Sequence, residues 1–153
     1  MAKSKFKLGI VGYGFVGQAI DYAFTNDELE KFYVDPKLQT NIDDLCKWNP
    51  ACVFVCAPTP MSDNGTVDGA IVEDAVLKLI EHTDALIVIK STVTPDILTR
   101  LYNSVHDDDK PRITHNPEFL TENNAKDQFI NSRMRIIGGP TEESCQRIVT
   151  LYS

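Results

Sequence analysis

The sequence has no run of basic residues and no apolar segment long enough to cross a membrane. Fifteen Lys and Arg residues stand against 22 Asp and Glu residues, for a formal net charge of −7. A negative chain without a basic block is a poor partner for nucleic acid and for anionic membranes. The longest apolar stretches, near 51–57 and 85–89, fall far short of the ~20 residues that a membrane helix needs. We therefore expect neither partner, and a cytoplasmic protein.

Cysteine is scarce, and its spacing does not suit a metal site. None of the four cysteines forms a C-x-x-C pair or stands with a histidine at zinc-ligand spacing. Cys52 and Cys56 belong to one apolar run, where an even spacing places both side chains on the same face of a strand. We expect Cys46, Cys52, Cys56 and Cys145 to be reduced, buried thiols, and the acidic turn at 106–111 to be a solvated loop. The sequence predicts no metal centre.

Short apolar runs alternate with longer amphipathic segments along the 153 residues, which suffice for one domain. Strands apolar on both faces and separated by helices predict a parallel sheet with crossover helices. We predict a Rossmann-type α/β domain over residues 1–153, a doubly wound, mainly parallel sheet of about six strands with helices on both faces. The expected strands are 6–11, 31–35, 51–57, 85–90, 112–115 and 133–139, and the expected helices lie near 15–25, 69–81, 95–105, 120–128 and 141–152.

A glycine-rich loop follows the first expected strand. Gly12, Gly14 and Gly17 have the G-x-G-x-x-G spacing, which provides a tight turn, a close approach to a pyrophosphate and close packing of the next helix. Asp35 lies 18 residues after Gly17, where a carboxylate accepts hydrogen bonds from the ribose hydroxyls and repels a 2′-phosphate. These features predict NAD rather than NADP as the cofactor. The alternative is that the glycines only form a turn, which Asp35 caps.

Three further motifs each begin at the carboxyl end of an expected strand, where open α/β sheets bind ligands. They are VCAPTP at 55–60 with DNGTVDGAIVEDAV after it, KSTVTPDILTRL at 90–101, and HNPEFLTENNAKDQF at 115–129 with SRMRIIGG behind it. Together with the glycine loop, they resemble the N-terminal NAD-binding domain of the UDP-glucose/GDP-mannose dehydrogenase family. The resemblance covers nearly the whole chain.

Enzymes of this family oxidise a nucleotide-sugar alcohol twice, to the acid, with two NAD. The resemblance thus implies a UDP-glucose 6-dehydrogenase-like activity, a nucleotide sugar as substrate and a homodimer in the full-length parent. It implies Thr92 beside the reacting centre, Glu118 as the acid–base or water-orienting carboxylate, and the backbone of Phe119 and Leu120 as part of the site that holds the sugar nucleotide. The implied cofactor contacts are Gly12, Tyr13, Gly14, Phe15, Val16, Gly17, Asp35, Pro58, Thr59, Thr92 and Glu122.

Glu118 and Glu122 are four residues apart, so a helical turn would place both carboxylates on one face. Hydrolysis of a covalent intermediate to an acid needs a base that activates water, and a glutamate with a raised pKa can serve. The alternative is that both are first-turn helix residues favoured by the helix dipole. Thr92 has an alternative too, as a strand-end residue before a helix capped by Ser91 or Thr94.

Two features depart from the family pattern. Only 22 residues separate Asp35 from Pro58, where family members carry a further strand–helix excursion; Lys37 is the candidate for the basic residue that follows the acid. The family's nucleophilic cysteine lies in a second, C-terminal domain, and none of the four cysteines here stands in that motif. We therefore expect a fragment, an isolated first domain or a naturally shortened protein, which binds NAD but is inactive by itself.

Two other functions stay open. A standalone NAD-binding module without turnover would suit the missing nucleophile, but it has no use for Thr92 and Glu118. The cofactor domain of a β-hydroxyacid dehydrogenase relative is the second, although such proteins often prefer NADP and place Asn-Arg where Asp35-Pro36 stands here. A glycine-flanked cysteine followed by Phe-Pro-Lys in the reading frame beyond Ser153 would distinguish the dehydrogenase from both.

Overall fold

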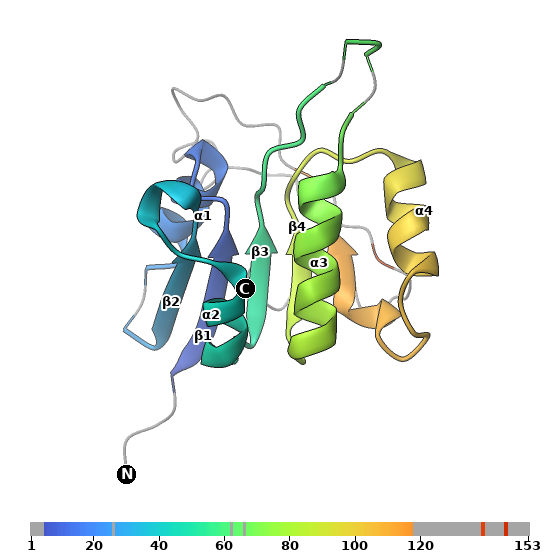
Figure 1. The fold of residues 1–153 in the computed structure, drawn as a ribbon. Coiled ribbons are helices and arrows are strands. Elements are labelled where there is room, and N and C mark those ends of the chain that lie inside the picture. The colour runs from blue at the N-terminus through green and yellow to red at the C-terminus, as the bar shows by residue number, and fades with distance from the viewer. Residues whose placement is uncertain are drawn as a thin grey trace.

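The computed structural model describes residues 5–25, 27–61, 63–65, 67–117, 139 and 146. Within them, five parallel strands form one sheet in the order β2-β1-β3-β4-β5 (Figure 1). The strands are β1 (Phe6–Val11), β2 (Leu29–Val34), β3 (Cys52–Val55), β4 (Leu86–Ile89) and β5 (Ile113–His115). The helices are α1 (Phe15–Ala23), α2 (Ile42–Trp48), α3 (Ala70–His82) and α4 (Pro95–Asn103), with 3-10 turns η1 (Pro36–Leu38) and η2 (Lys110–Arg112).

The expected parallel α/β fold is confirmed. Each of the five strands expected before residue 117 is present, and β3 and β4 are buried at every position, as their continuous apolar sequence predicted. Pro95 opens α4, because its fixed φ and missing N–H suit the first helical turn. The sixth expected strand at 133–139 and the helices expected at 120–128 and 141–152 lie outside the described residues, apart from Gly139 and Gln146.

Helix α2 is an element that the sequence analysis did not predict. It begins after Asn41, whose side chain accepts a hydrogen bond from the Asp44 N–H at 2.9 Å, and it ends at Asn49, which has a left-handed φ of 61°. Leu45 is its one fully buried residue. A seven-residue helix with a single core position gives no visible 3.6-residue period. Its signals were the two asparagines at its ends.

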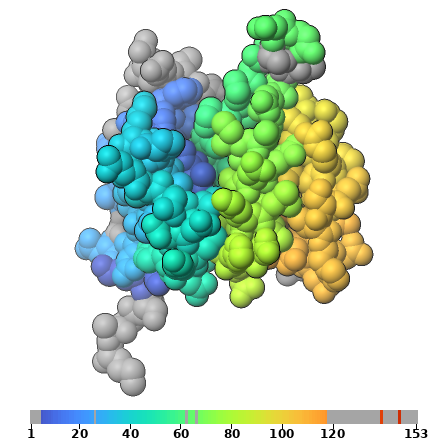
Figure 2. Space-filling model, in the orientation of Figure 1, coloured from blue at the N-terminus to red at the C-terminus, as the bar shows by residue number. Residues whose placement is uncertain are grey.

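Helices cover both faces of the sheet. On one face α2, α3 and α4 contribute Leu45, Val76 and Ile97 to a single apolar cluster, and this is the face seen in Figure 2. On the other face α1 packs Ala19 and Ile20 against the sheet. The doubly wound arrangement is thus present in the part of the chain that the structure describes.

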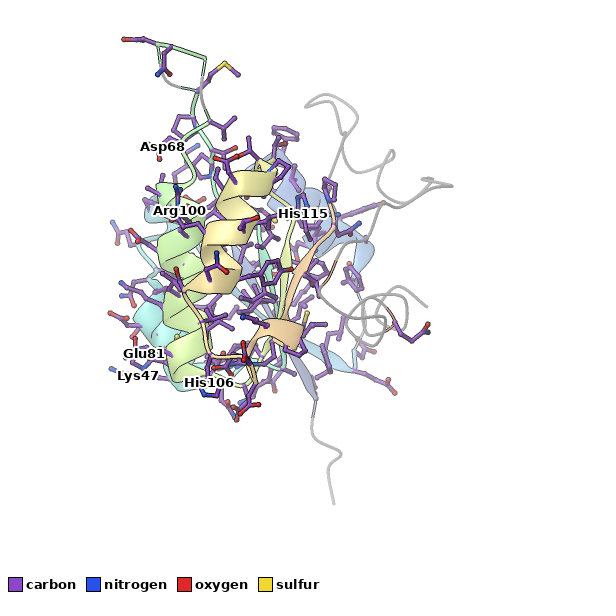
Figure 3. All side chains as sticks on the ribbon, turned by 90° about the vertical axis from the view of Figure 1, so that its right-hand side faces the viewer. Lys47, Asp68, Glu81, Arg100, His106 and His115 are labelled. Carbon is purple, nitrogen blue, oxygen red and sulfur yellow. The ribbon has the colours of Figure 1, made fainter. Side chains whose placement is uncertain are left out.

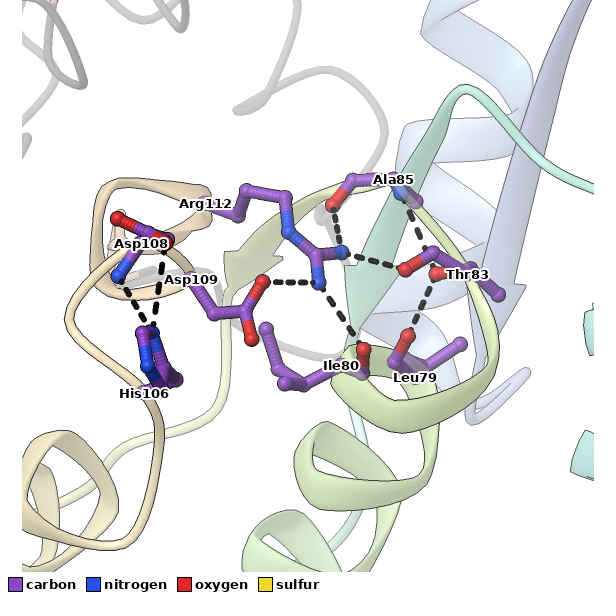
Figure 4. Close-up of polar contacts among 8 residues, drawn as sticks. All are labelled: Leu79, Ile80, Thr83, Ala85, His106, Asp108, Asp109 and Arg112. Carbon is purple, nitrogen blue, oxygen red and sulfur yellow. Dashed lines mark hydrogen bonds and ion pairs between the residues drawn. The ribbon is translucent and has the colours of Figure 1, made fainter.

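The carboxyl end of α3 is closed by a guanidinium group (Figure 4). One terminal nitrogen of Arg112 donates to the carbonyls of Thr83 and Ala85 at 2.8 and 3.2 Å. The other donates to the Ile80 carbonyl at 3.0 Å and to Asp109 Oδ1 at 2.9 Å. The acidic turn therefore supports a helix end, and no group of metal-ligating side chains occurs among the described residues.

The cysteine expectation is largely confirmed. Cys52 is buried, Cys46 and Cys56 are half-buried, and none of the three is in a disulfide. Cys52 and Cys56 belong to the cluster beneath α1, so they lie on the same face of β3. Cys145 is outside the described residues. No described helix is both long and apolar enough to span a bilayer.

Candidate functional site

The strand order creates a crevice at the carboxyl edge of the sheet. From β1 the chain passes to β2 on one side and then to β3 on the other, so the connections diverge at this edge. A cavity of about 660 Å³ lies there, bordered by Val11, Val34 and residues 56–58 at the ends of these three strands. In Figure 2 it opens between the cyan segment and green α3. Its size suits a nucleotide-sized ligand.

The three glycines of the loop serve different purposes. Gly12 has a φ of +91°, and a Cβ there would lie 2.6 Å from the Cys56 carbonyl oxygen. A Cβ on Gly17 would collide with the carbonyl oxygen of Gly12. A Cβ on Gly14 would meet none of the described residues within 4 Å apart from its neighbours in the chain, and Gly14 lines the cavity. The fold requires the first and third glycines, whereas the second leaves space for a ligand.

Asp35 lies directly after β2, and two backbone amides hold its carboxylate. Oδ1 accepts a hydrogen bond from the Lys37 N–H at 2.9 Å, and Oδ2 accepts one from the Tyr13 N–H at 2.8 Å. The bonds from Lys37 and Tyr13 lower the pKa of Asp35 below its ordinary value. Asp35 therefore caps η1, it also accepts the N–H of Tyr13 in the glycine turn, as the alternative interpretation allowed, and it borders the cavity as an anion.

The other sequence-predicted residues divide into three groups. Phe15, Val16 and Pro58 line the cavity together with Gly12, Gly14 and Asp35. Thr59, half-buried, and Thr92, exposed, follow β3 and β4 at the same edge of the sheet. The rest, Glu118, Phe119, Leu120 and Glu122, lie outside the described residues.

Sequence reasoning missed the wall of the cavity opposite the glycine loop. Ile71, Asp74, Ala75 and Lys78 of α3 line it, with Ile42 of α2. The four α3 residues have the i, i+3, i+4, i+7 spacing of one helical face. Because the helix was expected at 69–81, that face could have been found, but no local pattern identifies which face meets a ligand.

Beyond the cavity, polar side chains hold the ends of β3, β4 and β5 together. Ser91 Oγ donates to the Ala57 carbonyl at 2.7 Å, and the buried Lys90 Nζ donates to Asn116 Oδ1 at 2.8 Å. Thr94 occupies the N-cap position of α4 but forms no side-chain cap hydrogen bond. Of the two residues considered as caps, Thr94 therefore has the N-cap position without a capping side-chain hydrogen bond, and Ser91 is not the N-cap.

His115 ends β5 at this edge (Figure 3). Among the described residues, its Nε2 is buried and has no hydrogen-bond partner. Burial, and to a lesser degree the charge of Lys90, lowers the pKa of His115 below 6.5, although a hydrogen bond with the Ser91 backbone opposes this. The imidazole is therefore mainly neutral at neutral pH.

A model of the UDP-glucose/GDP-mannose dehydrogenase family, NAD binding domain, matches residues 37–153. The UDP-glucose 6-dehydrogenase of Rickettsia felis is 32% identical over 117 residues, covering 74% of this chain and 26% of the relative. That of Rickettsia bellii is 35% identical over 107 residues, covering 68% of this chain and 25% of the relative. The chain thus spans about a quarter of the length of these curated relatives.

Solved structures share the fold. GDP-mannose dehydrogenase from Pseudomonas aeruginosa, in a ternary complex, superposes with a TM-score of 0.73 at 20% identity over 95% of this chain and 43% of that one. UDP-glucose dehydrogenase from Pyrobaculum islandicum gives 0.71 at 20% identity over 97% of this chain and 44% of that one.

The family match and the two dinucleotide-binding features lie in different parts of the chain. The match begins at residue 37, so it includes the APTP, KST and HNPEF motifs but neither the glycine loop nor Asp35. The structure supplies those two features at the topological switch point, where dinucleotides bind. The chain therefore belongs to the UDP-glucose/GDP-mannose dehydrogenase family, as its NAD-binding domain, and its cofactor is NAD.

Proposed function

We propose that this domain serves a nucleotide-sugar dehydrogenase of the UDP-glucose 6-dehydrogenase type, which oxidises UDP-glucose to UDP-glucuronate in two NAD-dependent steps. The observation that carries the proposal is the cavity at the switch point, which joins the open Gly14 to the fixed carboxylate of Asp35. The relatives named UDP-glucose 6-dehydrogenase support the choice of substrate.

The cavity offers a distinct surface to each part of the cofactor. The amino end of α1 and the glycine loop provide backbone N–H groups for a pyrophosphate, which offsets locally the net charge of −7. Asp35 accepts hydrogen bonds from the ribose hydroxyls. Ile42 and Ile71 give apolar walls for the flat adenine ring. Bound NAD supplies the hydride acceptor.

The remaining roles concern the substrate half of the cleft. Thr92 lies beside the reacting centre, and Glu118 moves a proton or orients the water that hydrolyses a thioester on the nucleophilic cysteine of the second domain. The backbone of Phe119 and Leu120 helps hold the sugar nucleotide, while Glu122 and Thr59 contact the nicotinamide end of the cofactor.

We also propose that residues 1–153 form a single domain of a cytoplasmic protein that is a homodimer at full length. All described strands belong to one sheet, which supports the single domain. The reduced state of Cys46, Cys52 and Cys56, none of which is in a disulfide, suits a reducing compartment.

Replacing Asp35 should change cofactor selectivity. The unaltered chain should bind NAD much more tightly than NADP. Asp35→Ala should lower the ratio of the two affinities roughly ten- to a hundredfold, since hydrogen bonds to a charged group contribute about 1.5–3 kcal/mol. Calorimetric titration with both cofactors measures the gap. Asp74→Ala, which removes an acid from the opposite wall of the cavity, is the matched control and should leave the ratio nearly unchanged. Equal affinity of the unaltered chain for NAD and NADP would contradict the role of Asp35.

Turnover should require the thiol of the second domain. The 153-residue chain mixed with NAD and UDP-glucose should produce no sustained NADH, followed by the absorbance of reduced nicotinamide over hours. A form that includes the cysteine-bearing domain should form two NADH per UDP-glucose and leave GDP-mannose largely unused. Sustained NADH formation by the chain alone would overturn this assignment and would require a nucleophile among Cys46, Cys52, Cys56 and Cys145.

A further inference from the structure

A half-buried polar cluster lies beside the cavity and is not part of its wall. Asp21 of α1 is at its centre: its Oδ2 accepts a hydrogen bond from Tyr13 Oη at 2.5 Å, and its Oδ1 accepts one from Tyr33 Oη at 2.8 Å. Lys31 of β2 forms an ion pair with the same carboxylate and donates to the Asp21 main-chain carbonyl at 3.1 Å. The Asp21 carboxylate thus connects α1 and β2 to the glycine loop.

The cluster keeps Asp21 ionised and its phenol donors protonated. Burial alone would raise the pKa of Asp21, but the hydrogen bonds from Lys31, Tyr13 and Tyr33 lower it below its ordinary value. The hydrogen bond to Asp21, followed by burial, raises the pKa of Tyr13 to about 12. The bond between the Tyr13 phenol and Asp21 is therefore charge-assisted over the whole physiological pH range.

Tyr13 carries this restraint to Asp35. Its ring packs against Tyr33 with the centroids 4.8 Å apart, and its carbonyl accepts a hydrogen bond from Gln18 Nε2 at 3.2 Å. Its N–H is the donor that holds Asp35 Oδ2 at 2.8 Å. Gly12 and Gly14 flank Tyr13 and have no side chains, so at these three positions the Tyr13 side chain is the one that restrains the loop, through its hydrogen bond to Asp21.

We propose that Asp21 and Tyr13 are positioning residues that orient Asp35 toward the adenosine ribose. They thereby determine how strongly the site prefers a ribose that carries a 2′-hydroxyl over one that lacks it. Neither residue lines the cavity in the part of the chain that the structure describes, so their effect on binding passes through the Tyr13 N–H. The inference rests on the cofactor site proposed above and adds to it the cause of the Asp35 geometry.

The test compares NAD with an analogue that lacks the 2′-hydroxyl of the adenosine ribose. The unaltered chain should bind NAD about tenfold more tightly than this analogue, or more, which is the contribution expected from one hydrogen bond to a charged acceptor. Tyr13→Phe removes only the hydroxyl that Asp21 holds, and Asp21→Asn removes the charge. Both should reduce the preference several-fold, toward that of Asp35→Ala. A general loss of structure would weaken both ligands equally and leave the ratio unchanged.

Tyr33→Phe is the matched control. It also removes a phenol hydrogen bond from Asp21, but the main-chain N–H groups that hold the Asp35 carboxylate in the described part of the chain belong to Tyr13 and Lys37. Its preference for NAD should stay near that of the unaltered chain. An unchanged preference in Tyr13→Phe, or an equal drop in Tyr33→Phe, would overturn the positioning role. If the unaltered chain binds no NAD, the cofactor site fails and the inference fails with it.

A ligand-free measurement tests the contact itself. In the folded chain the pKa of Tyr13 is raised from 10 to about 12. The hydrogen bond from Tyr13 to Asp21 therefore stabilises the fold fully below pH 10, and this stabilisation is lost as the pH rises through about 12. Absorbance of tyrosinate should therefore develop at lower pH in Asp21→Asn than in the unaltered chain. An unchanged titration in folded Asp21→Asn would overturn the inference, and Tyr13→Phe tests it independently should Asp21→Asn fail to fold.

Discussion

Gly14→Val should abolish NAD binding while leaving cooperative unfolding nearly intact. Gly14 has φ −83° and ψ −159°, an extended backbone that residues with side chains also adopt. In the described part of the chain, a Cβ there meets nothing within 4 Å apart from its neighbours in the chain, and because Gly14 lines the cavity we expect the methyl groups of valine to project into it. They would occupy the space through which a pyrophosphate approaches the backbone. We expect at least roughly a hundredfold loss of affinity, about 2.7 kcal/mol.

Fluorescence titration with NADH measures the affinity, and urea unfolding measures the fold. Gly12→Ala is the contrasting variant: its Cβ would sit 2.6 Å from the Cys56 carbonyl at a φ of +91°, so it should destabilise the fold itself. Normal NAD binding by Gly14→Val would show that the loop is only a turn.

The contrast between these glycines shows how far the sequence could predict the site. The loop and Asp35 were recognisable because they belong to one strand–loop–helix–strand unit with fixed spacing. The same spacing predicted a separate role for each of Gly12, Gly14 and Gly17, and the structure adds the atoms that a side chain would meet, which are the Cys56 carbonyl at Gly12 and the Gly12 carbonyl at Gly17. The α3 wall could not be predicted in this way, because contact across the cavity is tertiary.

The fold was predictable where the apolar residues formed a continuous run or repeated over several helical turns. The buried strands β3 and β4 and the 13-residue α3 were found, whereas the seven-residue α2 was not. The cluster around Asp21 was also missed. It joins Asp21 to Tyr13, Lys31 and Tyr33, which lie 8, 10 and 12 residues away, and no helical or strand period brings such residues together.

The burial of Lys90 is another feature that could not be predicted from the sequence. The KST motif directed interest to Thr92, and lysine is seldom buried. The structure leaves Lys90 only 2% exposed, with its Nζ donating to Asn116 Oδ1 at 2.8 Å, and Asn116 is fully buried. A buried ammonium group depends strongly on its acceptors, which makes this contact a sensitive point of the fold.

Asn116→Ala should lower the free energy of unfolding more than Lys90→Met does. Alanine removes an acceptor and leaves the buried ammonium group one partner short, which costs about 1–3 kcal/mol or more for a charged donor. Methionine has a side chain of similar length and no charge, so Lys90→Met fills the space. The variant removes one hydrogen-bond donor from Asn116 Oδ1, which belongs to a neutral amide. The backbone N–H of Asn116 still donates to the Ile89 carbonyl at 2.9 Å in either variant, so the pairing of β4 with the end of β5 is retained.

Urea unfolding of both single variants and the double variant measures the coupling. The double variant should be less destabilised than the sum of the single ones, because Asn116→Ala strands no charge once Lys90 is methionine. Thr114→Val is the matched control: it removes a buried hydroxyl that donates to the Ile87 carbonyl at 2.7 Å and should cost only about 1 kcal/mol. A larger loss from Lys90→Met than from Asn116→Ala would contradict this prediction, because methionine keeps the apolar stem and the loss would then come from contacts of the ammonium group other than the one with Asn116.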